Sequence, residues 1–162
     1  RIYYFKDNKD PVSGPVKTFW SNGYVENTGT LLNGLKTENW EYFHDNGKLR
    51  AKGSYIKGEK SGEWLTYYNN GNMRSEEVYN RGKKTGVWAF YYRSGNIRTE
   101  EEYKDNNLEG IWKFYLESGE LKESGFQKNG QRDGILEIFD KSGDVVKRET
   151  WLMGVLKKVE LY

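Results

Sequence analysis

The sequence from 61 to 108 contains the same 24-residue pattern twice in succession. Trp64 recurs as Trp88 and Gly71 recurs as Gly95, and the frame continues in both directions without a gap. Six copies cover 13–36, 37–60, 61–84, 85–108, 109–132 and 133–156. A fixed period between about 20 and 50 residues is the signature of a repeat protein, in which each unit packs against its neighbours. This periodicity constrains the fold more than any other feature of the chain.

Two turn signals divide each copy into segments of strand length. The first signal is Asn22-Gly23, Asn46-Gly47, Asn70-Gly71, Ser94-Gly95, Ser118-Gly119 and Ser142-Gly143. The second is Asn33-Gly34, Lys57-Gly58, Arg81-Gly82, Asn129-Gly130 and Met153-Gly154. Asn-Gly between alternating segments favours a two-residue type I′ turn, and the segments are rich in aromatic and β-branched residues without helical periodicity. We therefore predict an all-β fold, an elongated antiparallel meander of β-hairpins, one per repeat, that forms a twisted, coiled open sheet.

No linker or change of composition divides the chain, so we predict one repeat domain over 1–162. The segment 1–12 would supply an N-terminal cap strand, from Ile2 to Phe5, and 157–162 a C-terminal cap strand. About a dozen strands exceed the roughly ten that open twisted sheets usually hold, which is the reason to expect coiling. Because the sequence begins at Arg1 rather than Met, we expect a segment upstream of it to have been removed.

The composition excludes several classes of function. The chain is 35% hydrophobic and 31% charged, but 16% of its residues are aromatic, which is unlike a disordered chain. The 26 basic and 24 acidic residues nearly balance, so nucleic acid is not an expected partner. With no Cys and one His, we expect no disulfide, no metal site and no cofactor. No apolar run approaches the roughly 20 residues of a membrane helix.

One position of the repeat is occupied by tryptophan in four copies. This tryptophan column is Val16, Trp40, Trp64, Trp88, Trp112 and Leu136. If both turns are two-residue loops, each tryptophan faces a position that is Gly53 or Gly125 in two copies, where a ring can cover bare backbone. We therefore predict Trp40, Trp64, Trp88 and Trp112 as the structural core. The alternative is a stacking platform for sugars or lipid headgroups.

The same register places two further columns opposite each other on the other face of the sheet. The aromatic column is Phe19, Phe43, Tyr67, Tyr91, Tyr115 and Phe139, and the basic column is Arg50, Arg74, Arg98 and Lys122. Pairs of this kind form cation–π contacts, and Arg and rigid aromatics are favoured at interface hot spots. The candidate binding face is therefore Phe43, Arg50, Tyr67, Arg74, Tyr91, Arg98, Tyr115 and Lys122. The alternative is a solvated face stiffened by stacking.

The core G-x-W-x-x-Y-Y followed by x-x-G-K-K, as in GEWLTYYNNG and NRGKKTG, resembles the bacterial variant of the MORN (membrane occupation and recognition nexus) repeat. The resemblance implies stacked hairpins, interaction rather than catalysis, and a protein partner. It leaves open a glycan- or lipid-headgroup-binding module of the cell envelope, or an antitoxin-type partner that masks a toxin. It favours a bacterial protein that is secreted or in the envelope, and leaves oligomeric state undetermined.

Three details complete the expectations. The carboxylates of Glu76, Glu77, Glu100, Glu101 and Glu102 could in principle pair for glycoside hydrolysis. They recur with the repeat, however, which active sites seldom do, so we predict no enzymatic activity. His44 stands where sister copies have Trp20, Tyr68 and Tyr92, so we predict a packing role. In the fifth copy an aromatic residue has moved to Phe126, which suggests a bulge or slip there.

Overall fold

The computed structural model describes residue 3 and residues 10–162, and the elements in this part of the chain are β-strands, without a helix. The chain divides into two compact units, Arg1–Lys83 and Lys84–Tyr162. The first unit contains β1 (Gly14–Phe19), β2 (Val25–Leu32), β3 (Leu35–Phe43), β4 (Leu49–Ile56), β5 (Glu59–Tyr67) and β6 (Met73–Asn80). The second contains β8 (Gly86–Tyr91), β9 (Ile97–Lys104), β10 (Asn107–Tyr115), β11 (Leu121–Lys128), β12 (Gln131–Arg132), β13 (Gly134–Phe139), β14 (Val145–Leu152) and β15 (Val155–Leu161). The two-residue strand β7 (Lys83–Lys84) spans the boundary. That residues 1–162 form one repeat domain stays a prediction.

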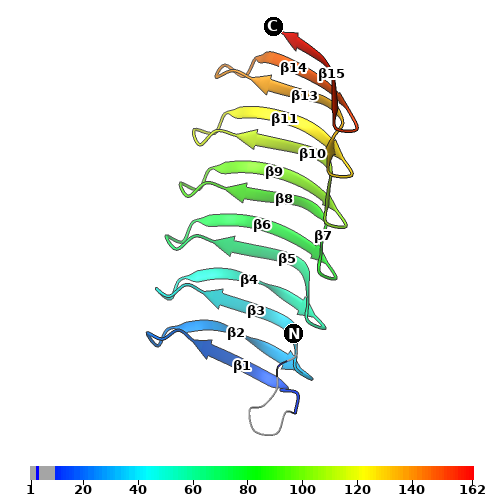
Figure 1. Ribbon diagram of the computed structural model, residues 1–162. Helices are drawn as coiled ribbons and strands as arrows, with labels where there is room; N and C mark the ends of the chain where they lie inside the picture. Colours follow the sequence, from blue (N-terminus) through cyan, green and yellow to red (C-terminus); the bar gives the residue numbers. More distant parts are fainter. Residues whose placement is uncertain (1–2, 4–9) are drawn as a thin grey trace. The chain divides into compact units, whose positions relative to one another are not determined.

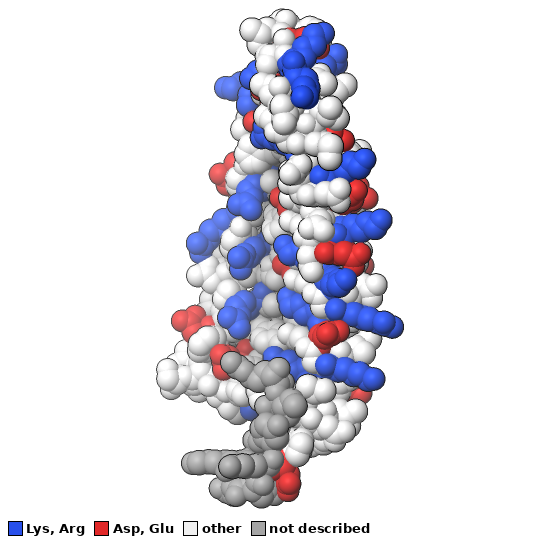
Figure 2. Space-filling model, turned by 45° about the vertical axis from the view of Figure 1, so that its right-hand side comes forward, with Lys and Arg blue, Asp and Glu red and all other residues white. Residues whose placement is uncertain are grey.

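Within each unit, strands that follow one another in sequence pair antiparallel (Figure 1). The order is β1 to β6 in the first unit and β8-β9-β10-β11-β13-β14-β15 in the second, where β12 pairs with β11. The sheet is open, so the predicted all-β meander of hairpins is confirmed. Charged side chains of both signs are interspersed on the face that Figure 2 presents.

The second turn of each copy is the predicted two-residue loop. In the turn between β2 and β3, Leu32 pairs with Leu35, and the two residues between them have positive φ, 49° at Asn33 and 73° at Gly34. This is the backbone of a type I′ turn. The fourth copy makes the same turn without glycine, with φ of 49° at Asp105 and 75° at Asn106, because Asp and Asn tolerate the left-handed region better than other side chains.

The first turn of each copy is one residue longer than predicted. Between β3 and β4, the His44 amide donates to the Lys48 carbonyl at 2.8 Å and the Gly47 amide to the His44 carbonyl at 2.9 Å. Only Gly47 has positive φ, 79°, which fits a type I turn followed by a left-handed glycine. The Asn46 side-chain oxygen accepts a hydrogen bond from the Lys48 amide at 3.1 Å, the local bond that favours Asn at such turns. The prediction of type I′ at this turn was wrong.

A β-bulge follows each three-residue turn and changes the register once. Phe43 pairs with Leu49 and Tyr42 pairs with Ala51, so Arg50 has no partner across the strand pair. From Tyr42 onward the predicted register holds, and Trp40 pairs with Gly53. The same shift recurs in the other hairpins. Because neighbours along a strand face opposite ways, the bulge moves the basic column to the face that carries the tryptophans.

The predicted cap strands at the two ends of the chain and the predicted irregularity in the fifth copy can be compared with the structure. The strand predicted from Ile2 to Phe5 lies outside the described residues except for Tyr3, whose amide donates to the Gly34 carbonyl at 2.8 Å. The predicted C-terminal cap strand is part of β15, which begins earlier, at Val155. At Phe126 the β10 side is in register, because Phe126 pairs with Ile111. On the other side of β11 the register shifts between Ser124, which pairs with Glu137, and Gln127, which pairs with Arg132, so the irregularity expected there is present.

Candidate binding face

Three of the four tryptophans predicted as core are buried. Trp40, Trp64 and Trp88 keep only 2%, 1% and 2% of their surface exposed. A Cβ added to Gly53 would lie 2.3 Å from the Trp64 ring, so that ring lies directly on the glycine backbone. Gly53 was expected to be covered, but the ring comes from the next strand, β5, rather than from its hairpin partner Trp40. Trp40 covers Gly29 in the same way. Covered rings cannot serve as an open stacking platform.

A lysine lies over each buried tryptophan. Lys60 Nζ is 4.2 Å from the centre of the Trp64 ring and 4.6 Å from that of Tyr79, and 3.7 Å from Glu77 Oε2. The Tyr79 hydroxyl donates a hydrogen bond to the same carboxylate at 2.9 Å. We call this set of lysine, tryptophan and tyrosine a lysine cage. A cation held over ring faces in this way is stabilised by the ring quadrupoles.

Two further hairpins hold a lysine cage. Lys84 Nζ is 4.2 Å from the Trp88 ring centre and 4.5 Å from that of Tyr103. Lys36 Nζ is 4.1 Å from the Trp40 ring centre and donates to the Tyr42 hydroxyl at 2.7 Å. The sequence analysis missed these cages, although each lysine stands four residues before its tryptophan. The signal was a lysine two residues after the glycine of the second turn, in the segments G-L-K, G-E-K and G-K-K.

Burial keeps the cage tyrosines in their neutral form. Desolvation raises the pKa of Tyr42, Tyr79 and Tyr103 well above the usual value near 10. The hydrogen bonds that Tyr79 and Tyr103 donate to Glu77 and Glu101 raise it further. Each phenol therefore remains a hydrogen-bond donor across the ordinary pH range.

The hairpin of β10 and β11 lacks a lysine cage although it keeps its tryptophan. Leu108 stands at the lysine position and Gln127 at the tyrosine position. Trp112 is partly exposed, unlike the other three predicted core tryptophans. Its Nε1 would lie 3.0 Å from a Cβ on Gly125, so the ring rests on its own hairpin partner. The strand before it carries Glu101 where Trp40 and Trp64 find glycine. Trp88 is buried although Glu77 stands at the same position before it, so the missing lysine and tyrosine distinguish Trp112 from the other three.

The predicted binding face divides between the two sides of the sheet. The Arg50 guanidinium lies 5.9 Å from the Tyr42 ring centre, and that of Arg98 6.0 Å from the Phe90 ring centre. Tyr42 lies on the tryptophan face, where its ring stacks 6.1 Å from that of Trp40. The predicted pairing of the basic column with the aromatic column is therefore wrong, because the bulge separates the two columns.

The eight residues of that predicted face differ in exposure. Arg74 and Arg98 are exposed, whereas Phe43, Arg50, Tyr67, Tyr91, Tyr115 and Lys122 are half-buried. Lys122 Nζ donates to the Phe139 carbonyl at 3.2 Å. The Tyr115 hydroxyl donates to Glu100 at 2.8 Å, and burial together with this bond raises the pKa of Tyr115 to about 12. A binding role for these residues stays a prediction.

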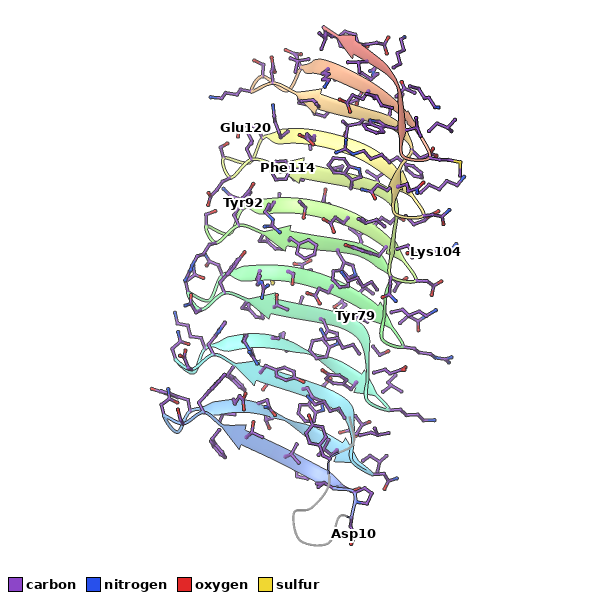
Figure 3. The ribbon with its side chains drawn as sticks, in the orientation of Figure 1. Asp10, Tyr79, Tyr92, Lys104, Phe114 and Glu120 are labelled. Carbon is purple, nitrogen blue, oxygen red and sulfur yellow. The ribbon has the colours of Figure 1, made fainter. Side chains whose placement is uncertain are left out.

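His44 makes the same contact as its counterparts in other copies. Its Nε2 lies 3.0 Å from the Tyr67 carbonyl. Trp20 Nε1 donates to the Phe43 carbonyl at 3.1 Å, and the hydroxyl of Tyr92, at the first-turn end of β8, donates to the Tyr115 carbonyl at 2.8 Å (Figure 3). The packing role predicted for His44 agrees with this contact. Within the described ranges, no group of three His, Cys, Asp or Glu side chains could hold a metal ion.

An exposed apolar row lies on the opposite face of the second unit. It consists of Val87, Ile111, Phe126 and Ile135, whose exposed fractions run from 39% to 58%. Glu102 of β9 pairs with Val87 and lies between it and Ile111. Val87 and Ile111 directly precede tryptophans, so they point away from the tryptophan face. The first unit has Asn39 and Glu63 at the corresponding positions. The sequence analysis missed this row, whose signal was the change from polar to aliphatic residues before the tryptophans.

These features define an open antiparallel β-repeat protein whose successive hairpins are built on one pattern. The MORN repeat variant matches residues 39–57, 60–81, 84–105 and 108–129, which together exceed half of the chain, and the chain belongs to this family. No curated protein matches the chain. MORN repeats are generally involved in binding proteins or membrane lipids. Over residue 3 and residues 10–162, no helix is long and apolar enough to cross a membrane.

Proposed function

We propose that this chain is a non-enzymatic repeat scaffold that binds a protein partner. The observation that carries the proposal is the apolar row of Val87, Ile111, Phe126 and Ile135 on the second unit. Exposed apolar side chains that adjoin one another, rather than standing singly, are typical of interaction surfaces. Ile111 and Phe126 pair directly across β10 and β11, so their side chains adjoin.

The tryptophan rings on which a glycan would stack are buried in the core. Trp40, Trp64 and Trp88 are covered by neighbouring strands and lysines. The carboxylates of Glu77 and Glu101 accept hydrogen bonds from tyrosines of the cages, which favours a structural role over glycoside hydrolysis. A masked toxin would be one case of a protein partner, and a bacterial envelope protein would be one setting for the scaffold.

Membrane lipid is the second candidate, because an apolar row also suits a bilayer surface. The near balance of 26 basic and 24 acidic residues gives weak attraction to anionic headgroups. Sedimentation with vesicles of phosphatidylserine and phosphatidylcholine tests this candidate. Binding that is lost in the Val87→Ser/Ile111→Ser variant would favour lipid over protein.

The test for a protein partner uses two matched variants. A photoreactive residue at Ile135 cross-links the partner, and the affinity of that protein is then measured for each variant. We expect Val87→Ser/Ile111→Ser to weaken binding at least tenfold. The control Leu32→Ser/Ile56→Ser removes two equally exposed aliphatic side chains from the first unit and should leave the affinity unchanged. Equal affinity of both variants would refute the proposal.

A further inference from the structure

We propose that the cavity formed by β9, β10 and β11 binds a cationic side chain, lysine or arginine, presented by a partner protein. The side chain would take the place of the lysine that this hairpin lacks. This site lies on the tryptophan face of the second unit and is separate from the apolar row. Its ligand is defined by the chemistry of the lysine cages in the sister hairpins.

The sister hairpins show what occupies this place in the repeat. In the hairpins that begin at β3, β5 and β8, an ammonium lies 4.1 to 4.2 Å from a tryptophan ring centre. In the hairpin of β10 and β11 the residue at the lysine position is Leu108, which has no charge. A cavity of about 320 Å³ opens there. The sister hairpins therefore show that this place in the repeat holds an alkylammonium group.

The walls of the cavity supply the groups that a cation requires. Trp112 and Phe114 contribute aromatic rings, and Phe114 is marked on β10 in Figure 3. Glu101 and Glu123 contribute carboxylates. Glu123 stands where the other hairpins have Ala51, Ser75 and Thr99, so a carboxylate appears in a hairpin that has lost its lysine. Aromatic faces combined with negative charge are the usual means of recognising a cationic side chain.

The cation among the residues that line the cavity, Arg132, is directed to another hairpin. Arg132 lines the cavity, but its guanidinium lies 5.1 Å from the Trp151 ring centre and its Nη1 lies 3.9 Å from Glu149 Oε2. Two carboxylates against one partly neutralised guanidinium leave the cavity with negative charge. A second cation is therefore attracted rather than repelled.

Two buried polar atoms at the cavity have no hydrogen-bond partner. Trp112 Nε1 and Thr99 Oγ1 are both unpaired, whereas Trp64 Nε1 donates to the Ser54 carbonyl at 3.1 Å. An unpaired buried donor is costly. The hairpin thus lacks the closure that its sister copies have. A protein-borne cation, rather than a free amine, is expected because this inference rests on the proposed binding of a protein partner.

The test follows the indole N–H signals of the ¹⁵N-labelled protein, which has six tryptophans. The Trp112→Phe variant identifies the Trp112 signal. The probe is Nα-acetyl-lysine methylamide, and the control probe is the same compound with its ε-amine acetylated and therefore neutral. We expect the charged probe to shift the Trp112 signal saturably, and the neutral probe to bind at least about tenfold more weakly. Equal shifts with both probes, or no shift with either, would overturn the proposal.

Two variants make the test specific to the cavity. Leu108→Lys restores the internal lysine and should abolish the shift, while the other five indole signals report that the fold is intact. Glu123→Gln should weaken probe binding about twofold to fivefold, as expected for the loss of a partly exposed charge contact. Glu117→Gln, at an exposed carboxylate of the same unit, should leave binding unchanged. Undiminished binding by Leu108→Lys would contradict the proposed site.

Discussion

The hairpin of β5 and β6 in the first unit and the hairpin of β10 and β11 in the second have the same backbone conformation. They differ in the residues that cover their tryptophan. Both have the three-residue first turn, the bulge after it and a tryptophan at the same position. Trp64 is covered by Lys60 and lies on a glycine of the preceding strand, whereas Trp112 has neither neighbour. The difference shows that turns and bulges define the repeat, while the residues on its tryptophan face can vary.

The largest expected effect on stability is a difference between two tryptophans of the second unit, Trp88, which lies in a lysine cage, and Trp112, which does not. Trp88→Ala should lower the free energy of unfolding by about 3–5 kcal/mol, because a buried ring is replaced by a cavity. Trp112→Ala should cost clearly less, since Trp112 is partly exposed and already borders a cavity. Urea unfolding followed by circular dichroism measures both. Equal losses would mean that the cage does not determine the strength of the core.

A smaller difference in stability is expected between alanine substitutions at Gly53 and Gly125, two glycines that contact tryptophan rings. Gly53→Ala should destabilise the protein by about 1–3 kcal/mol, the usual cost of overpacking, because its Cβ would lie 2.3 Å from the Trp64 ring. Gly125→Ala should cost less, since its Cβ would meet Trp112 at 3.0 Å, beside open space. The same unfolding measurements apply. A larger loss for Gly125→Ala would reverse the assignment of which ring is tightly packed.

Alkaline pH should distinguish the units through their tyrosines. Folding raises the pKa of Tyr42, Tyr55 and Tyr79 in the first unit and of Tyr103 and Tyr115 in the second. The unfolded chain then loses protons first, so the stabilisation is complete below pH about 10 and is lost as the pH rises above it. Between its pKa in the unfolded and in the folded chain, each tyrosine lowers the stability by on the order of 1 kcal/mol per pH unit.

Hydrogen exchange at two alkaline pH values measures that difference. Amides of the first unit, which has more raised tyrosines, should lose protection before those of the second. Tyr79→Phe is the control, because it removes one titrating phenol and should flatten the alkaline decline. A uniform loss of protection would show that these tyrosines do not titrate as separate groups.

The smallest effect on stability is expected at the exposed arginines of the basic column. Arg74→Ala/Arg98→Ala should change the free energy of unfolding by no more than about 0.5 kcal/mol, as for most surface sites. If the tryptophan face contacts the partner, the same variant weakens binding severalfold without loss of stability. Unchanged affinity would mean that this column is only a solvated row, as the alternative interpretation of the sequence stated.

The sequence predicted the period, the strands and the second turns because these depend on local residue types. Asn-Gly at Asn33 and Gly34 requires left-handed backbone and admits few alternatives. The prediction for the first turns was wrong because Asn-Gly, as at Asn46 and Gly47, is also compatible with a three-residue loop. In that loop only the glycine has positive φ. The additional loop residue shifts the register at the start of the following strand by one. The basic position after the turn therefore lies on the tryptophan face, and the hydrophobic position before the basic one lies on the opposite face.

The site was predictable only in part. The tryptophan column was recognised as core, but the cage lysines were treated as turn residues, because nothing local shows that Lys60 returns over Trp64. The cavity at Trp112 depends on the joint absence of a lysine and a tyrosine that come from different strands. Such coincidences become visible only when the register is known.

Each tryptophan of the first unit completes the hairpin before its own, since Trp40 lies on Gly29 and Trp64 on Gly53. In evolutionary terms, a substitution in one copy of such a tandem array is therefore expressed in the next copy. In the hairpin of β10 and β11, where Leu108 replaces the lysine and Gln127 the tyrosine, a cavity lies beside the tryptophan. A duplicated gene segment can thus acquire a new pocket by single replacements, while the backbone of every copy is inherited unchanged.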